Sequence, residues 1–140
     1  MGLNVANEKT TTQMLDFVAE KMSEEFGLDI AGYSFYGDTE KEIPNYMLLC
    51  ECDKPEILVE KKEDVENFID ESLRNANEKY EKYRRWGMLS APEVLPLQKG
   101  AYDDYRASLV AQGRALNQIK PVVVLNTPEK KAFFFGNVMK

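Results

Sequence analysis

The stretch Tyr46-Met47-Leu48-Leu49-Cys50-Glu51-Cys52 decides the fold, because it contains almost no polar side chain before Glu51. A strand with one face in water alternates apolar and polar residues, whereas a strand covered on both faces is a continuous apolar run. Residues 46–52 therefore predict a strand that is buried on both sides. The rest of the chain is expected to supply the layers that cover it.

A helix is predicted ahead of this strand, over residues 10–26. Its apolar side chains recur every four residues and so share one helix face: Met14, Val18, Met22 and Phe26. Thr10 and Gln13 have the spacing of a capping box, which predicts the start of the helix. Gly27 occupies the position of a left-handed C-cap, which predicts its end.

A second strand is predicted between the helix and the central strand, at residues 29–36, which are rich in aromatic and β-compatible side chains. The polar segment 37–44 contains Gly37 and Pro44 and is typical of a turn. The two strands are therefore expected to form an antiparallel hairpin with a long loop.

The longest helix is predicted after the central strand and is expected to end at Gly87. Its apolar stripe steps by three or four residues: Val65, Ile69, Leu73, Ala76, Tyr80 and Tyr83. The remaining elements are, in order, a strand at 91–98, a helix between Gly100 and Gly113, a short strand at 122–125 and a tail at 128–140. Pro92 and Pro96 each remove a backbone donor, so the first of these strands is expected at an edge or in irregular pairing.

The tail carries Phe133–Phe135, which either packs on the domain or presents an apolar patch to a partner. With helices and strands intermixed in this order, the sequence predicts an α+β fold: a small mixed, largely antiparallel sheet packed by helices. The length of 140 residues fits a single domain over residues 1–140.

Composition excludes several classes of function. The 24 acidic residues outnumber the 18 basic ones, which gives a net charge of −6 and disfavours nucleic acid and anionic membranes as partners. No apolar run approaches the ~20 residues that span a bilayer. The chain has no histidine, so a histidine general base, a Ser-His-Asp triad and a His-containing zinc site are all excluded.

The two cysteines predict reduced core thiols in a cytoplasmic protein. Cys50 and Cys52 would point the same way from a strand, but a disulfide across so short a loop would be strained. Two thiols also cannot complete a four-thiolate metal site, so no metal centre is expected.

Lys120 is the candidate functional residue. Pro121 favours an extended backbone at Lys120, so the side chain is expected to project from a stiff connection. Gln118 lies two residues earlier and would face the same way in an extended chain. An ammonium group, a compact charge with three donors, suits a phosphate.

Several segments resemble one family in their order and spacing: 7–11, 43–46, 77–84, 89–94, 99–105 and 113–120. The sequence is similar to the C-terminal domain of the auxin-responsive-promoter (Gretchen Hagen) family of acyl-acid amido synthetases from about Asn7 to Val124. That family has an Arg-Gly-x-x-x-x-Gln-x-Lys segment. In this chain Gln112-Gly113 stands in place of Arg-Gly, and Gln118 and Lys120 match the Gln and Lys of the segment. It departs from the family's Lys-x-Pro-Arg continuation at Pro121-Val122-Val123.

The resemblance implies a mobile lid domain of an adenylate-forming enzyme. A large N-terminal domain would bind ATP, Mg²⁺ and the acyl acid, and an amine would then take the acyl group from the adenylate. By the resemblance, Lys120 is the catalytic lysine that reaches the phosphates, and Gln118 is a substrate-binding residue. This chain has none of the ATP-binding motifs, so it is expected to bind no cofactor and to make no adenylate alone. The alternative interpretation is a non-catalytic α+β binding or oligomerisation module.

Overall fold

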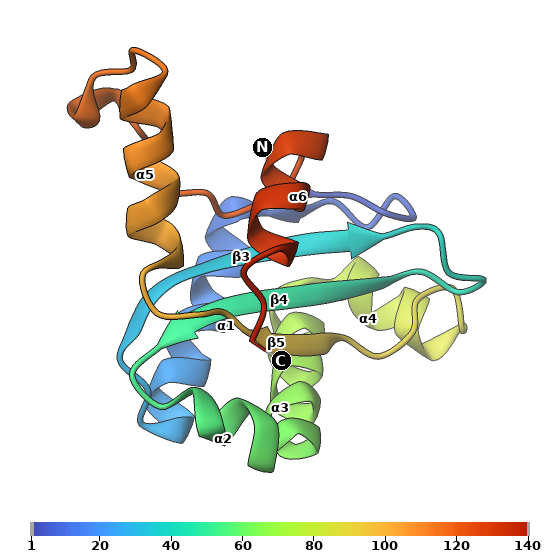
Figure 1. Cartoon of the computed structure of the whole chain (residues 1–140). Coiled ribbons are helices and arrows are strands. Elements are labelled where there is room, and N and C mark those ends of the chain that lie inside the picture. Colours follow the sequence, from blue (N-terminus) through green and yellow to red (C-terminus); the bar gives the residue numbers. More distant parts are fainter. Residues whose placement is uncertain (1, 140) are drawn as a thin grey trace.

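A computed structural model describes residues 2–139, apart from the side chain of Gln118 (Figure 1). The elements are, in chain order, β1 (Gly2–Leu3), β2 (Thr10–Thr11), α1 (Thr12–Phe26), β3 (Ile30–Asp38), β4 (Asn45–Cys52), α2 (Pro55–Glu60), α3 (Lys62–Ala76), α4 (Glu78–Arg85), β5 (Glu93–Pro96), α5 (Ala101–Ala111), the 3₁₀ helix η1 (Leu116–Gln118) and α6 (Pro128–Phe135). No helix within residues 2–139 has the length and apolarity needed to cross a membrane.

The main sheet has the order β3-β4-β5, with β4 in the centre. β3 and β4 pair antiparallel, which confirms the predicted hairpin, and β5 pairs parallel with β4. A separate two-stranded sheet joins β1 and β2 antiparallel. The α+β fold predicted from the sequence is therefore confirmed, with the predicted third strand shortened to four residues at the sheet edge.

Both faces of β4 are buried, as its apolar run predicts. Leu48 and Cys50 face a core that includes α1 and α3, whereas Leu49 faces a second core beneath α5 and α6. All three side chains are 0% exposed. Figure 1 shows the same three layers, with α1 and α3 behind the sheet and α6 in front of it. The central strand therefore fixes the positions of helices on both sides.

The start of α1 lies one residue later than the capping box predicted. The N-cap is Thr11, whose hydroxyl accepts a hydrogen bond from the Met14 amide at 3.2 Å. Thr10 belongs to β2 instead, and its buried hydroxyl lies 2.7 Å from the hydroxyl of Tyr46. The end of the helix is as predicted, since Gly27 adopts a left-handed conformation with φ 64°.

The predicted long helix is wrong in one respect, because it is broken at Asn77 into α3 and α4. The Asn77 side-chain oxygen accepts hydrogen bonds from the amides of Lys79 and Tyr80, at 3.0 and 3.3 Å, and so caps α4. Its side-chain nitrogen donates to the Glu8 carbonyl and the Thr10 hydroxyl, at 2.9 and 2.8 Å. One buried amide therefore ends one helix, starts the next and ties both to the N-terminal segment.

We expect Asn77→Ala to lower the free energy of unfolding by about 2 kcal/mol, since it removes an N-cap and leaves buried polar groups without partners. Urea unfolding followed by circular dichroism measures this loss. The control is Asn75→Ala on the exposed surface of α3, for which we expect a change within about 0.5 kcal/mol. Equal stability of the two variants would contradict the role of Asn77.

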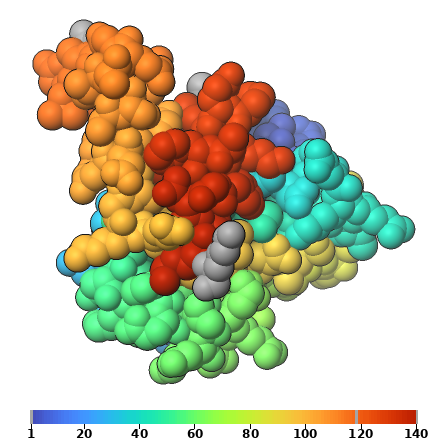
Figure 2. Space-filling model, in the orientation of Figure 1, coloured from blue at the N-terminus to red at the C-terminus, as the bar shows by residue number. Residues whose placement is uncertain are grey.

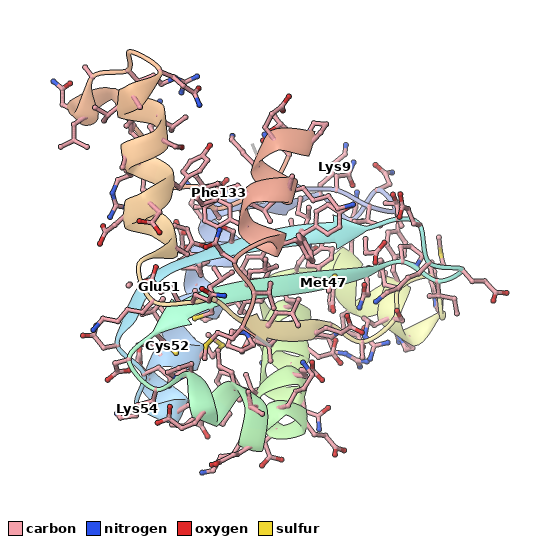
Figure 3. The ribbon with its side chains drawn as sticks, viewed as in Figure 1. Lys9, Met47, Glu51, Cys52, Lys54 and Phe133 are labelled. Atoms are coloured by element: carbon pink, nitrogen blue, oxygen red, sulfur yellow. The ribbon has the colours of Figure 1, made fainter. Side chains whose placement is uncertain are left out.

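The aromatic tail packs on the domain. α6 begins at the N-cap Thr127, and Phe134 is 0% exposed beneath it. The Phe134 ring centroid lies 4.7 Å from that of Tyr102 and 5.0 Å from that of Tyr105, both on α5. Figure 3 shows Phe133 between α6 and α5 as well. The first of the two interpretations of this segment is therefore correct, and Phe134 offers no surface to a partner.

Candidate functional site

A cavity of about 810 Å³ opens between α1, the first half of β3, α5 and the segment that carries Lys120. The residues that line it come from four places: Thr12, Asp16, Ala19, Glu20 and Ser23; Asp29–Tyr33; Tyr102, Tyr105 and Arg106; and Ile119–Val123. The sequence-predicted Lys120 thus lies on the wall of a large cavity, and its side chain is exposed.

The lining of the cavity carries charges of both signs. α5 and the segment after it contribute Arg106 and Lys120 to the lining, whereas α1 and the residue before β3 contribute Asp16, Glu20 and Asp29. Arg106 forms an ion pair with Asp103, a carboxylate that is 79% exposed. Among the described side chains, the Lys120 ammonium has no hydrogen-bond or ion-pair partner. It is therefore a cation free to contact an anionic ligand.

The segment after Lys120 is bonded to β3. The Ser34 hydroxyl donates to the Val122 carbonyl, and the Phe35 amide donates to the Val123 carbonyl at 2.7 Å. The Leu125 amide donates a hydrogen bond to the Phe35 carbonyl at 2.9 Å. The predicted strand at 122–125 is thus reduced to one parallel bridge, between Val124 and Phe35. The sheet therefore anchors the chain from Val122 onward, two residues after Lys120.

The neighbouring helix α5 is held by a buried carboxylate. Glu51, at the end of β4, accepts hydrogen bonds from the amides of Gly100 and Tyr102, at 2.8 and 3.1 Å. Because the first amides of a helix have no partner within it, a carboxylate at this end both completes their hydrogen bonding and meets the positive end of the helix dipole. In Figure 3, Glu51 lies at the base of α5.

Tyr102 fixes α5 against β3. Its hydroxyl lies 2.7 Å from the Ser34 hydroxyl, and burial raises the pKa of Tyr102 well above its ordinary value. A Cβ atom at Gly32 would lie 2.5 Å from the ring of Tyr102, so only glycine lets β3 and α5 approach this closely. Ser34 therefore links α5 to the Lys120 segment through a single hydroxyl.

The backbone around Gln118 differs from the predicted extended chain. Residues 116–118 form a turn of 3₁₀ helix, η1, and extended geometry resumes at Ile119. The expectation that Gln118 and Lys120 share one face of an extended strand is therefore wrong for the backbone. The side chain of Gln118 lies outside the described part of the structure.

One of the acidic residues that line the cavity, Asp16, is hydrogen-bonded to a tyrosine. The Tyr33 hydroxyl donates to the Asp16 carboxylate, which draws α1 toward β3. No group of three or more metal-ligating side chains comes together within the described residues. Among the described residues, the carboxylates that line the cavity are therefore not gathered into a group of three.

Sequence reasoning missed Arg106, which lines this cavity, and Glu51, which holds the start of α5 beside it. In the sequence, Arg106 is indistinguishable from other exposed residues of the predicted helix between Gly100 and Gly113. Glu51 is the first polar residue after a long apolar run, and it is only 7% exposed. A buried carboxylate requires a partner, and that requirement was the available signal.

Comparison with known proteins gives a consistent result. The family model described as the GH3 family C-terminal domain matches residues 12–129. Among solved structures, one named GH3.15 acyl acid amido synthetase is similar over 99% of this chain, with a TM-score of 0.83 and 20% sequence identity. One named AtGH3.15 acyl acid amido synthetase in complex with 2,4-DB is similar over 99% of this chain, with a TM-score of 0.76 and 16% identity.

These two structures are much longer than the chain described above. The similarity covers 25% of the first and 26% of the second, so this chain spans about a quarter of each. At these identities the likeness shows a common fold. No curated protein matches the sequence.

Proposed function

The chain belongs to the GH3 family, whose C-terminal domain matches residues 12–129, and from this membership we propose that it serves as the lid domain of an ATP-dependent acyl acid amido synthetase. In the proposed reaction, the carboxylate of an acyl acid attacks the α-phosphate of ATP and pyrophosphate leaves. An amine, such as an amino acid, then takes the acyl group from the adenylate and releases AMP. We propose that this domain closes over the bound nucleotide and supplies a cation.

The observation that carries the proposal is the Lys120 ammonium, which lies on the wall of the 810 Å³ cavity without an ionic partner among the described side chains. Negative charge gathers around the phosphates as pyrophosphate departs. A cation that approaches only at that stage stabilises the transition state more than the ground state and so raises the rate. Lys120 is accordingly proposed as the catalytic residue of this domain.

Arg106 extends this proposal to a second cation on the same cavity. Its partner Asp103 is highly exposed, and an exposed ion pair is worth only about 0–1 kcal/mol, so a phosphate can compete for the guanidinium. Gln118 is proposed as a substrate-binding residue through its side-chain amide. Arg106 lies on α5, and Gln118 lies in the segment between α5 and α6 that also carries Lys120.

The proposed partner is an N-terminal domain of the same enzyme that binds ATP, Mg²⁺ and the acyl acid. This chain offers phosphate-binding cations, whereas its described residues hold no cluster of metal ligands, so Mg²⁺ is assigned to the partner domain. The two free thiols, Cys50 and Cys52, support the further proposal that the enzyme works in the cytoplasm.

The proposal is tested by ATP–pyrophosphate exchange, which measures adenylation directly. The complete enzyme is expected to exchange labelled pyrophosphate into ATP only when an acyl acid is present. The 140-residue chain alone, under the same conditions, is expected to give no exchange above background. Exchange by the isolated chain, or none by the complete enzyme with any of a panel of carboxylic acids, would reject the proposed function.

A further inference from the structure

A second cavity, of about 400 Å³, lies at the far end of β4 and contains the side chain of Cys52 on its wall. It is lined also by Asp29, Ala31, Glu51, Asp53, Pro55, Leu97, Lys99 and Met139. The pairing of β3 with β4 is irregular between Ile30 and Gly32, directly opposite this end of β4. A bulge of this kind bends a strand and interrupts its pairing, and the half-buried Cys52 lies at this irregularity, on the wall of the cavity.

Two thiols meet at this point. Cys50 and Cys52 are both free, and because they are two residues apart on one strand their side chains leave the same face of the sheet. Cys50 is 0% exposed in the core, whereas Cys52 is only partly covered. The buried thiol therefore has no route to a reagent, and the outer thiol has one.

The surroundings favour ionisation of the outer thiol. A hydrogen bond from the Cys50 S–H group, helped by the Lys54 amide, lowers the pKa of Cys52 to about 7, although burial and the carboxylates of Asp53 and Glu56 oppose the shift. The same hydrogen bond and burial raise the pKa of Cys50. Near neutral pH a larger fraction of Cys52 is thus thiolate than the about 3% expected for an ordinary cysteine with a pKa near 8.5.

We propose that Cys52 is a modification site that exchanges with small disulfides and holds the added group in the 400 Å³ cavity. The Cys52 thiolate attacks one sulfur of R–S–S–R, a Cys52–S–S–R bond forms, and the original S–S bond breaks. The leaving R–S⁻ departs with the electron pair and takes a proton from water. Cys52 is oxidised, the departing sulfur is reduced, and no other oxidant is needed.

The mixed disulfide is expected to persist. Release by Cys50 would require the buried thiol to ionise and would produce a disulfide across a two-residue step, which is strained. The external disulfide is therefore not resolved within the protein, and a reducing thiol from solution is needed to remove it.

Charge identifies the preferred reagent as a cationic disulfide. The cavity is lined by three carboxylates, Asp29, Glu51 and Asp53, and by one ammonium, Lys99. In water, before screening by salt, two excess negative charges at roughly 7 Å attract a monovalent cation and repel a monovalent anion, which together favour the cation by about fiftyfold in local concentration. The chemical class that fits is a small aminothiol in its disulfide form.

The test uses the purified chain, treated with cystamine or with glutathione disulfide at low ionic strength, and followed by intact mass and peptide mapping. We expect one cysteamine per chain, on Cys52, added more than about tenfold faster than glutathione, with the advantage shrinking as salt is added. Adduct on Cys50, or faster reaction with the anionic glutathione disulfide, would overturn the proposal. Cys52→Ser is expected to remain unmodified.

A matched pair of variants tests the role of the inner thiol. Cys50→Ser keeps a hydrogen-bond donor, so the midpoint of the rate against pH should stay near the wild-type value of about 7. Cys50→Ala removes the donor, and we expect the midpoint to rise toward about 8.5. Equal midpoints for the two variants would show that Cys50 does not act as the hydrogen-bond donor to Cys52. If Cys50→Ala does not fold, a wild-type midpoint at about 8.5 serves as the contradicting result. None of these measurements requires adenylation activity.

Discussion

Replacing Lys120 by alanine in the complete enzyme is expected to slow ATP–pyrophosphate exchange by about a thousandfold. A unit charge about 4 Å from a phosphate oxygen, at an effective dielectric constant near 20, contributes about 4 kcal/mol. If that contact forms only as pyrophosphate departs, almost all of it appears in the rate. The side chain is exposed and unpaired among the described residues, so folding should be unaffected.

Two further variants separate the lysine's charge from its surroundings. Lys120→Arg keeps a positive charge in a planar group with different reach, so we expect an intermediate rate. Lys82→Ala removes an exposed lysine from α4, remote from the cavity lining, and should leave exchange unchanged. Exchange by a folded Lys120→Ala enzyme within tenfold of wild type would rule out the proposed role.

Replacing Glu51 by alanine is expected to lower the free energy of unfolding by about 3–4 kcal/mol. The carboxylate accepts two hydrogen bonds at the start of α5, and bonds to a charged acceptor contribute about 1.5–3 kcal/mol each. The substitution also leaves the amides of Gly100 and Tyr102 without an acceptor. Thermal and urea unfolding of the purified chain measure the loss.

The variant Glu51→Gln is expected to have a free energy of unfolding between those of the wild type and Glu51→Ala. One amide oxygen replaces two carboxylate oxygens, so one of the two helix amides keeps its acceptor, and the loss should be smaller than for alanine. Glu42→Ala, in the exposed loop between β3 and β4, is the control and should change stability by less than about 0.5 kcal/mol. Equal stability of Glu51→Ala and Glu42→Ala would show that α5 does not depend on this carboxylate.

Most of the fold can be predicted from the sequence because buried positions are occupied by apolar residues in a recognisable pattern. The apolar run that ends at Cys50 indicated a strand covered on both faces, and Leu48 and Leu49 do lie in different cores. The parallel pairing of β5 was not recognised, although a long helical connection between two strands is the usual sign of a parallel pair. Here that connection contains α2, α3 and α4.

The break at Asn77 could not be read from the helical pattern. The apolar stripe passes from Ala76 to Tyr80 at the spacing of a continuous helix, so periodicity alone predicts no interruption. The deciding hydrogen bonds run to Glu8 and Thr10, which are remote in sequence. Contacts of that kind appear only once the chain is folded.

The candidate site was predicted in part. Pro121 and the family resemblance predicted Lys120 as a functional residue, and Lys120 lines the 810 Å³ cavity. Arg106 and Glu51 were not identified, because each acts through its position relative to a distant segment. A local pattern indicates which residue types are present, but it does not state which elements will meet.

The hydrogen bonds that join residues 122–125 to Ser34 and Phe35 have a consequence for how the lysine can travel. Because the anchor begins at Val122, flexing of the segment before it can move the ammonium only within the two-residue tether, about 7 Å of extended chain, plus the length of the lysine side chain. Under the proposed function, a larger displacement of the ammonium would have to come from rotation of the whole domain relative to its proposed partner.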